Sequence, residues 1–369
     1  MCYEERKVYI QSANTCSRRH FLRLAASGVG TVLVGRGGIA RAASGKISVY
    51  SALNESTNNA FVEAFKKSVP GIHVELLPLA AAGELQTRIR TEKDSPKGDV
   101  FIGGSSEFHS PLGTEGLLLP YQSPNAANVD PIYKDADGMW TGWYLGIFGF
   151  VLNTDRFVKE LKDLKKPASW DDLLNPAWKG HLTLPDPVKT GGGYIYIATQ
   201  IFRFAAAAMA ASPNADQYAS AEDKAMEYMK KLHTNIGQYT GTAPQAIQLV
   251  GQGQFIGAPN WSHDILTAKS QGQPIDNLNP QPTGFEVGAV SIIKGGPNPE
   301  GAKAFVDWVL TKEAGVLNVK LSNRLSVLKD VAPAPGAPTL DSVQLVPYDR
   351  VWATHNKARI LKKWQVAIS

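Results

Sequence analysis

A chain of 369 residues is long enough for about two domains. Its composition, 43% hydrophobic and 19% charged, is that of a globular protein and excludes a disordered, collagen-like or coiled-coil chain. The net charge is +5, but residues 1–42 hold seven basic and two acidic residues, which leaves 31 of each sign in residues 43–369. The basic excess belongs to the N-terminus alone, so nucleic acid is not an expected partner.

The first 42 residues have the layout of an export signal. Residues 17–23 read Ser-Arg-Arg-His-Phe-Leu-Arg, and a short apolar stretch and a small-x-small cleavage pattern at residues 40–42 follow. The paired arginines resemble the twin-arginine type. The apolar stretch is too short and too rich in Gly and Ser to span about 30 Å of hydrocarbon. We expect cleavage between Ala42 and Ala43 and a periplasmic protein.

Both cysteines of the chain, Cys2 and Cys16, lie within this signal. The mature chain is therefore predicted to have no disulfide, no thiolate metal site and no cysteine nucleophile. Neither a cofactor nor a metal is expected.

Strand and helix patterns alternate along the first part of the mature chain. They predict, in order, strand, helix, strand, helix and strand at residues 46–50, 56–67, 72–77, 84–93 and 99–102. Ser56 is the predicted N-cap of the first helix. This order is typical of a parallel sheet with helices packed on it.

A second series of elements begins near residue 148. Strands are predicted at residues 148–153, 181–184, 255–259 and 285–293, and helices at 194–211, 221–233, 243–251, 263–271, 299–310 and 349–364. No internal repeat at a fixed period is found.

Four segments resemble a known family. They are Val49-Tyr50-Ser51 at the end of the first strand, residues 180–184 (Gly-His-Leu-Thr-Leu), residues 186–191 (Asp-Pro-Val-Lys-Thr-Gly) and residues 298–308 (Asn-Pro-Glu-Gly-Ala-Lys-Ala-Phe-Val-Asp-Trp). Their order and spacing are similar to those of the type II periplasmic solute-binding proteins of ABC transporters, in the branch named after the ferric-ion binders. The resemblance covers about residues 46–365.

This resemblance implies a two-lobe α/β fold with two crossing hinge strands and a ligand cleft between the lobes. Lobe 1 would comprise residues 43–150 and 290–369, and lobe 2 residues 151–289, with crossings at 148–153 and 285–290. The implied partners are a small solute and an inner-membrane permease, and the implied state is a monomer.

Four small, polar loops follow predicted strands, at residues 51–56, 80–84, 103–106 and 189–193. In open α/β sheets ligands bind beyond the carboxyl ends of the strands. Backbone N–H groups and hydroxyls at helix N-termini suit an anion. The same Ser and Thr residues also suit simple helix caps. The candidate ligand residues in these loops are Ser51, Asn54, Ser105, Ser106, Thr190, Gly191 and Gly192.

The residue types at two positions bear on whether the protein binds iron. By resemblance, the family's iron binders carry adjacent tyrosines after the strand that ends here at Pro259, and often a histidine where this chain has Asn54. The chain reads Asn260-Trp-Ser-His-Asp264 at the tyrosine position. A hard ferric ion then lacks phenolate ligands, so a ferric-iron binder is the alternative interpretation rather than the preferred one.

The substituted residues resemble the subgroup that binds sugar phosphates. By that resemblance Ser51, Ser105, Thr190 and Gly191 would hold the phosphate, and His263, Asp264 and Glu286 the sugar hydroxyls. Carboxylates repel a dianion, so the acidic and phosphate contacts are expected at opposite ends of the cleft. The chain departs from the family's usual Ser-Gly-Thr by reading Thr190-Gly-Gly. Phosphonates and other small organic anions therefore stay as alternative ligands.

Each of these residues has a simpler alternative. Asp264 could merely start a helix, Glu286 could pair with a lysine across the hinge, and Trp261, which could stack on a sugar ring, could fill the core.

An exported enzyme is the rival class of function. The chain has no G-x-S-x-G, H-E-x-x-H or phosphate-loop motif, and Ser262, His263 and Asp264 are adjacent, so they cannot form a catalytic relay. No enzymatic activity is expected.

Overall fold

The computed structural model describes residues 43–79, 82–211 and 218–369. The predicted export signal and its cleavage site lie outside these residues, as do residues 80 and 81 of one predicted ligand loop. Among the described residues, no helix has both the length and the apolar character that crossing a membrane requires.

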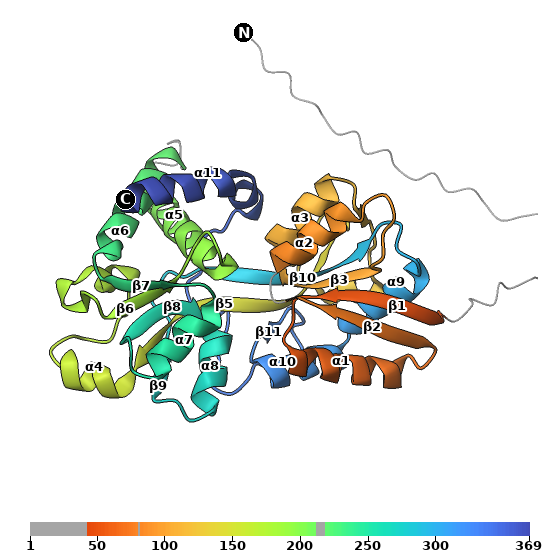
Figure 1. Ribbon diagram of the computed structural model, residues 1–369, viewed down its shortest axis with the longest axis horizontal. Coiled ribbons are helices and arrows are strands. Elements are labelled where there is room, and N and C mark those ends of the chain that lie inside the picture. Colours follow the sequence, from red (N-terminus) through yellow and green to blue (C-terminus); the bar gives the residue numbers. More distant parts are fainter. Residues whose placement is uncertain (1–42, 80–81, 212–217) are drawn as a thin grey trace, which may run out of the picture. The chain divides into compact units, whose positions relative to one another are not determined.

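Helices and strands alternate along the chain (Figure 1). The strands are β1 (Gly45–Ser51), β2 (Ile72–Pro78), β3 (Val100–Ser105), β4 (Leu118–Leu119), β5 (Thr141–Asn153), β6 (Leu182–Pro185), β7 (Ile236–Thr240), β8 (Gly257–Trp261), β9 (Ile275–Leu278), β10 (Phe285–Ile293) and β11 (Leu325–Ser326). The helices are α1 (Glu55–Ser68), α2 (Ala82–Thr91), α3 (Ser106–Thr114), α4 (Thr154–Glu160), α5 (Gly191–Ala211), α6 (Ala219–His233), α7 (Ala243–Gly251), α8 (Ser262–Ser270), α9 (Pro299–Val309), α10 (Lys312–Ser322) and α11 (Arg350–Ile368). Short 3₁₀ helices lie at Pro124–Asn128, Pro131–Tyr133, Trp170–Leu174 and Pro176–Trp178.

The strands form one mixed sheet in the order β2-β1-β3-β10-β5-β8-β6-β7, with β4 added to β10 and β9 and β11 added to β5. Strands β1, β2 and β3 are parallel, as are β6, β7 and β8, whereas β10 runs antiparallel to both β3 and β5. The predicted α/β fold with parallel strands and covering helices is confirmed.

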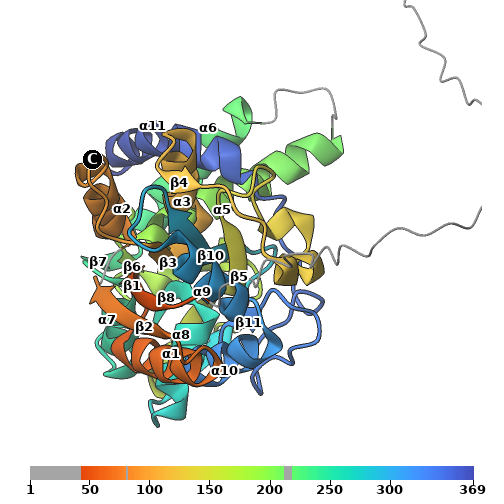
Figure 2. The same cartoon turned by 90° about the vertical axis from the view of Figure 1, so that its right-hand side faces the viewer.

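Strand β5 belongs to both halves of the sheet. Its residues Thr141 to Ile147 pair with β10, and Phe148 to Leu152 pair with β8. All thirteen residues of β5 and all nine of β10 are buried, which fits their nearly unbroken apolar sequences. Figures 1 and 2 show the two strands side by side in the middle of the sheet. The crossing predicted at residues 148–153 thus begins earlier in the chain, at Thr141.

We call the part around β1, β2, β3 and the first half of β5 the first lobe, and the part around β6, β7, β8 and the second half of β5 the second lobe. Each has its own hydrophobic core. Phe65, Trp143 and Phe305 are among the core residues of the first lobe, and Trp170 and Phe202 are among those of the second.

The last helix does not follow the predicted lobe boundary at residue 290. Helix α11 packs on α6, and its buried residues Ala353, Ile360 and Trp364 belong to the core of the second lobe. A sequence pattern identifies an amphipathic helix but not the sheet face that will receive it. The chain therefore returns from the first lobe to the second at its C-terminal end.

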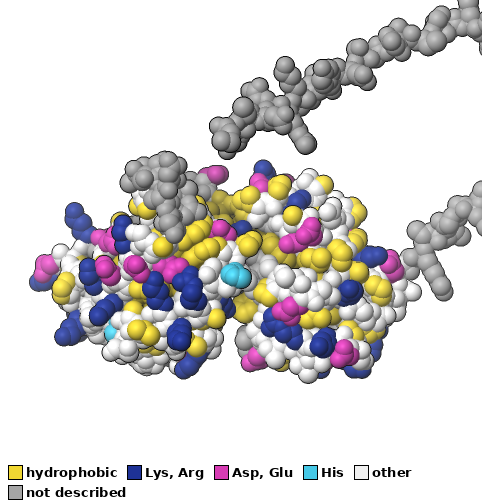
Figure 3. Space-filling view, turned by 90° about the horizontal axis from the view of Figure 1, so that it is seen from above, with side chains coloured by type: hydrophobic (Ala, Val, Ile, Leu, Met, Phe, Trp, Pro, Cys, Tyr) yellow, Lys and Arg dark blue, Asp and Glu magenta, His cyan; other side chains and the backbone are white. Residues whose placement is uncertain are grey.

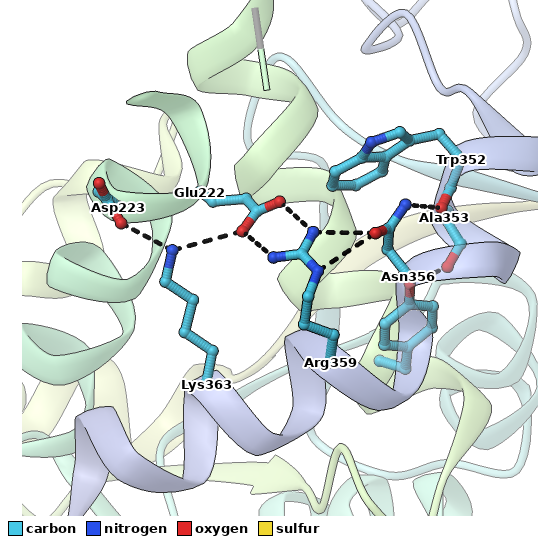
Figure 4. A network of polar contacts seen from close by, with 8 residues as sticks. Glu222, Asp223, Trp352, Ala353, Asn356, Arg359 and Lys363 are labelled. Atoms are coloured by element: carbon cyan, nitrogen blue, oxygen red, sulfur yellow. Dashed lines mark hydrogen bonds and ion pairs between the residues drawn. The ribbon is translucent and has the colours of Figure 1, made fainter. Parts of the chain in front are cut away.

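A buried carboxylate holds α11 in place (Figure 4). Glu222 on α6 has a side chain only 5% exposed, and it accepts hydrogen bonds from Arg359 Nη1 at 2.7 Å and Nη2 at 2.5 Å. Lys363 Nζ lies 3.3 Å from the same carboxylate and 2.7 Å from Asp223 Oδ1. The Tyr194 hydroxyl on α5 donates to the Ala353 carbonyl. Paired, bidentate contacts of this kind make a buried charge stable.

Candidate functional site

The first predicted loop uses its polar side chains within the protein. Asn54, not Ser56, is the N-cap of α1, because its side chain accepts from Thr57 N at 2.9 Å, and Ser56 donates to the same Asn54 oxygen. The buried Ser51 hydroxyl donates to Asn58 Oδ1 at 2.6 Å and accepts from Leu53 N at 3.2 Å. The prediction of Ser56 as the cap is therefore wrong, since the helix begins at Glu55.

His109 supports the end of β3, where the sequence predicted the loop at residues 103–106. One imidazole nitrogen lies 3.1 Å from the Gly103 carbonyl and the other 2.9 Å from Ser291 Oγ, and the ring stacks on Phe101 at 3.9 Å. Burial lowers the pKa of His109 to about 3, so the ring is neutral at physiological pH. Gly103 and Gly104 have φ of +86° and +73°, a conformation that favours glycine.

Ser105 is the last residue of β3 and Ser106 the first of α3, so the predicted loop at residues 103–106 is a strand end followed directly by a helix. Ser105 is the N-cap residue, but its side chain makes no capping hydrogen bond. The buried Ser106 hydroxyl lies 3.4 Å from Glu107 Oε2. Glu107 is 8% exposed, and its Oε1 has no hydrogen-bond partner among the described residues. A buried, unpartnered carboxylate oxygen was not expected here.

The predicted loop 189–193 is partly helical, because α5 begins at Gly191 rather than at Tyr194. Thr190 Oγ1 donates to the Asp186 carbonyl and accepts from Gly193 N, both at 3.0 Å. A Cβ atom at Gly193 would lie 2.3 Å from the Pro185 carbonyl, so the tight start of the helix requires glycine. Gly191 and Gly192 lie in the first turn, where helix N–H groups lack intrahelical partners.

Phe108 brings the first-lobe loops against the start of α5. A Cβ atom added at Gly83, Gly104 or Gly191 would lie 3.6 Å from an atom of its ring. The N-terminal turns of α2, α3 and α5 therefore meet around one aromatic side chain. We call these N-terminal turns around Phe108 the anion end, because helix N-termini favour the binding of anions.

Lys357 on α11 reaches the anion end and was missed by the sequence analysis. Its Nζ lies 4.8 Å from the ring centroid of Phe108 and 5.2 Å from that of Tyr194. Burial lowers its pKa, and the nearby charge of Glu107 partly opposes that change. No hydrogen bond or ion pair to its ammonium group is found in the described part of the chain. A lysine on a distant C-terminal helix gives no sequence signal for such a position.

The second-lobe candidates lie on a strand end and a helix start rather than in a loop. Strand β8 extends to Trp261 and α8 begins at Ser262, so His263 and Asp264 occupy the first helical turn. Trp261 is buried, packs edge-on against Phe148 at 4.8 Å, and its Nε1 lies 3.0 Å from where a Cβ atom of Gly192 would be. The structure thus joins the start of α5 to the start of α8.

His263 and Glu286 are brought together over Gly146 of β5. A Cβ atom there would lie 3.1 Å from His263 Cε1 and 2.9 Å from Glu286 Oε1. The His263 ring is 3% exposed, and neither nitrogen has a hydrogen-bond partner among the described residues, although Asp264 Oδ1 lies 3.5 Å from Nε2. We call His263, Asp264 and Glu286 the acidic end.

The acidic end is strongly influenced by burial. Burial raises the pKa of Glu286 to about 7, against an opposing effect of the Arg324 charge, with Glu107 and Asp264 raising it further. Burial also lowers the pKa of His263 well below its usual value. The alternative in which Glu286 pairs with a lysine is wrong, because no described lysine forms an ion pair with it. The charge that it faces is Arg324.

The predicted residues therefore fall into one connected series. Phe108 contacts the region of Gly191, Gly192 neighbours Trp261, and the Trp261 and His263 rings lie nearly parallel with centroids 6.0 Å apart. Ser51 and Asn54 make only local bonds. The anion end and the acidic end occupy different parts of this series, but Glu107 acts on the pKa of both Lys357 and Glu286, so one carboxylate lies near both ends.

A surface hollow of about 490 Å³ lies between α3, the turn at residues 135–139 and α11, and contains none of the predicted ligand residues. Figure 3 looks onto the face that carries α11 and shows acidic and basic side chains interspersed there rather than gathered by sign. We do not assign the ligand to this hollow, because the unpartnered buried polar atoms lie elsewhere.

The two tyrosines of α5, Tyr194 and Tyr196, make contacts within the protein. Tyr194 donates to the Ala353 carbonyl, and the Tyr196 hydroxyl lies 2.7 Å from that of Tyr228. Burial raises the pKa of both phenols. No group of three or more His, Cys, Asp and Glu residues suited to a metal ion is found within the described ranges.

The chain belongs to the family of bacterial extracellular solute-binding proteins, whose model matches residues 60–342. An uncharacterized protein from Haemophilus influenzae is 30% identical over 87% of this chain and 90% of its own length. The structure of the periplasmic binding protein AfuA from Actinobacillus pleuropneumoniae, with exogenous fructose-6-phosphate bound, is similar with a TM-score of 0.76 and 29% identity over 88% of this chain and 98% of that one. The Fe(3+)-binding periplasmic protein of Serratia marcescens is 23% identical over 77% of this chain and 79% of its own length.

These similarities confirm the predicted branch of the family and the two-lobe fold. The chain is a periplasmic binding protein of an ABC importer, as the sequence indicated. Its relatives are solute-binding proteins that work outside the cytoplasm rather than enzymes.

Proposed function

We propose that this protein captures a small phosphorylated sugar by closing its two lobes around it, and delivers it to a membrane permease. The phosphate would lie at the anion end, against the first turns of α3 and α5, and the sugar hydroxyls at the acidic end. Ser105, Ser106, Thr190, Gly191 and Gly192 are the proposed phosphate contacts, now with Lys357. Trp261, His263, Asp264 and Glu286 are the proposed sugar contacts.

One observation carries this proposal: the acidic end holds buried polar atoms that lack partners. Both ring nitrogens of His263 are buried without a hydrogen bond, and Glu286 is 8% exposed with no ion pair among the described residues. Leaving such groups unsatisfied is costly. Hydroxyl groups donate and accept at once, and so suit an imidazole and carboxylates together. The relative with fructose-6-phosphate supports the same chemistry.

Ser51 and Asn54 are weaker candidates than the sequence indicated. Their side-chain oxygens already serve the first turn of α1, so the Asn54 side-chain nitrogen and the backbone groups of that loop are left for a ligand. We include three further points in the proposal. The layout of the N-terminal signal supports export through the twin-arginine route, and the solute-binding family supports the absence of enzymatic activity. We also propose that the protein acts as a monomer.

The test is a thermal melt of the purified protein with separate hexose phosphate, free hexose, inorganic phosphate and ferric citrate. A ligand at 100 times its dissociation constant adds about 2.7 kcal/mol of stability, which raises the melting temperature by several degrees. We expect the largest shift with hexose phosphate. A shift with ferric citrate alone would favour the iron-binding alternative and overturn this proposal.

A further inference from the structure

Arg324 is held in the acidic end by contacts on both sides of it in the chain. The preceding residue, Asn323, ends α10 in the left-handed conformation with φ of 55°, and its Nδ2 donates to Thr267 Oγ1 on α8 at 2.9 Å. The following residue, Leu325, begins β11 and pairs with Leu145 of β5. The backbone at Arg324 is therefore attached both to a helix of the second lobe and to the shared strand.

The side chain of Arg324 lies over an aromatic ring. Its guanidinium carbon is 4.8 Å from the centroid of Tyr144, within the range of a cation–π contact. Gly288 on β10 makes room for that ring, since a Cβ atom there would lie 1.9 Å from Tyr144 Cζ. The Arg324 Nε is buried without a hydrogen-bond partner among the described residues.

The charges around Arg324 are near it but do not contact it. It lowers the pKa of both Asp264 and Glu286, against the raising effect of burial, and also contributes to the lowered pKa of His263. Yet no nitrogen of Arg324 comes within 4.0 Å of either carboxylate, since the ion pairs of the described residues do not include it. Arg324 and Asp264 are both partly exposed, so polar atoms of a ligand can reach these opposite charges, which do not pair with each other.

We propose that Arg324 contacts the ligand, and that with Asp264 and Glu286 it makes the acidic end selective for a polyhydroxylated ligand over a simple phosphate or phosphonate. This inference rests on the proposed function and deepens it. A guanidinium only donates hydrogen bonds and a carboxylate only accepts them. A hydroxyl placed between the two satisfies both, whereas a phosphate oxygen there would accept from the guanidinium but be repelled by the two carboxylates.

The decisive variant is Arg324→Met, which keeps an apolar stem over Tyr144 and removes the donors and the charge. The matched control is Arg88→Met, because Arg88 also lies over a tyrosine ring, that of Tyr50 at 5.5 Å, and is not among the proposed ligand contacts. Titration calorimetry at pH 7 with a hexose phosphate and with inorganic phosphate measures both affinities. We expect Arg324→Met to lose ten- to a hundredfold in hexose-phosphate affinity and less than threefold in phosphate affinity.

A pH series separates ligand contact from mere structural support. Without Arg324, Glu286 faces Glu107 from α3, Asp264 and His263 from α8, and Tyr144 from β5, with no opposing positive charge. Its carboxyl then needs a higher pH to ionise. The hexose-phosphate affinity of Arg324→Met should recover partly between pH 7 and 9, whereas the wild type should change less than threefold over that range. If Arg324→Met does not fold, Arg324→Lys is measured instead. Because lysine keeps the positive charge, we expect this variant to keep the pH profile of the wild type and to lose less hexose-phosphate affinity than expected for Arg324→Met.

Equal losses for both ligands, or an unchanged hexose-phosphate affinity in the variant, would overturn the assignment of Arg324. If the wild-type protein itself bound no sugar phosphate, the proposed function would fail first, and the role of Arg324 with it.

Discussion

His263 on α8 and Glu286 on β10 face each other across Gly146 of β5, at distances of 3.1 and 2.9 Å from the place where a Cβ atom would be. Three elements thus meet at one place, and the two side chains approach β5 this closely because residue 146 is a glycine. A ligand that binds there meets a neutral imidazole and a carboxyl whose pKa is about 7.

Displacing these two side chains should weaken ligand binding. Gly146→Ala puts a methyl group against both side chains, so we expect hexose-phosphate affinity to fall at least tenfold, measured by titration calorimetry. The control is Gly241→Ala, where the nearest atom to the new methyl group, Gln245 Oε1, is 3.7 Å away. Similar affinities for the two variants would contradict the position of the site.

Glu286 should make binding depend on pH. Its carboxyl accepts hydrogen bonds at both oxygens only when ionised, and its pKa of about 7 means that this form is lost as pH falls from 8 to 6.5. We expect wild-type affinity for a hexose phosphate to weaken over that range. Glu286→Gln should bind about tenfold more weakly at pH 8 and show little pH dependence, whereas the exposed control Glu300→Gln should resemble the wild type.

Lys357 should strengthen the binding of the anionic group. Replacing it by glutamine removes the positive charge beside Phe108, so affinities for hexose phosphate and inorganic phosphate should both fall about tenfold, with a weaker dependence on salt. Lys362→Gln on the exposed side of the same helix is the control. A loss for free hexose as large as that for its phosphate would instead indicate that Lys357 only holds the lobes together.

Glu107 should act in the opposite direction. Its buried carboxylate, with one unpartnered oxygen, lies near Lys357 and the start of α5. Glu107→Gln removes a negative charge at nearly constant volume, so we expect binding of a phosphate ester to strengthen several-fold. Weaker binding in this variant would show that Glu107 itself contacts the ligand.

Glu222 should stabilise the protein rather than bind ligand. Glu222→Gln weakens the paired contacts to Arg359 and Lys363 on α11, with an expected loss of about 1–2 kcal/mol in the free energy of unfolding. Differential scanning calorimetry measures the loss. Glu313→Gln, which changes an exposed carboxylate that accepts only from Ser68, is the control and should melt like the wild type.

The strand and helix patterns predicted an α/β fold and the family resemblance implied its two lobes, but the first half of β5, Thr141 to Ile147, was not predicted as a strand. The first residue of each helix was harder to predict from the sequence. Asn54 and Ser56 are both good caps by type, and only the hydrogen bond from Thr57 N distinguishes them. Likewise, three consecutive glycines predicted a loop at residues 191–193, but the Thr190 side chain stabilises a helical turn there.

The candidate site could be predicted only in part. His263, Asp264 and Glu286 were proposed by resemblance, and in the structure they lie near one another. Arg324 and Lys357 were not identified, because each lies on an element whose place beside the site depends on tertiary packing. Lys357 enters through the contact of α11 with the second lobe, and Arg324 through the pairing of β11 with β5. Neither contact has a local sequence signature.

The return of α11 to the second lobe has a practical consequence. The first described strand, β1, belongs to one lobe and the last helix to the other, and residues 43–369 contain no cysteine. A single cysteine introduced near each end could carry a donor and an acceptor dye without competing thiols. Energy transfer between the dyes would then follow the approach of the lobes directly, which makes the folded chain a ready optical sensor for its own ligand.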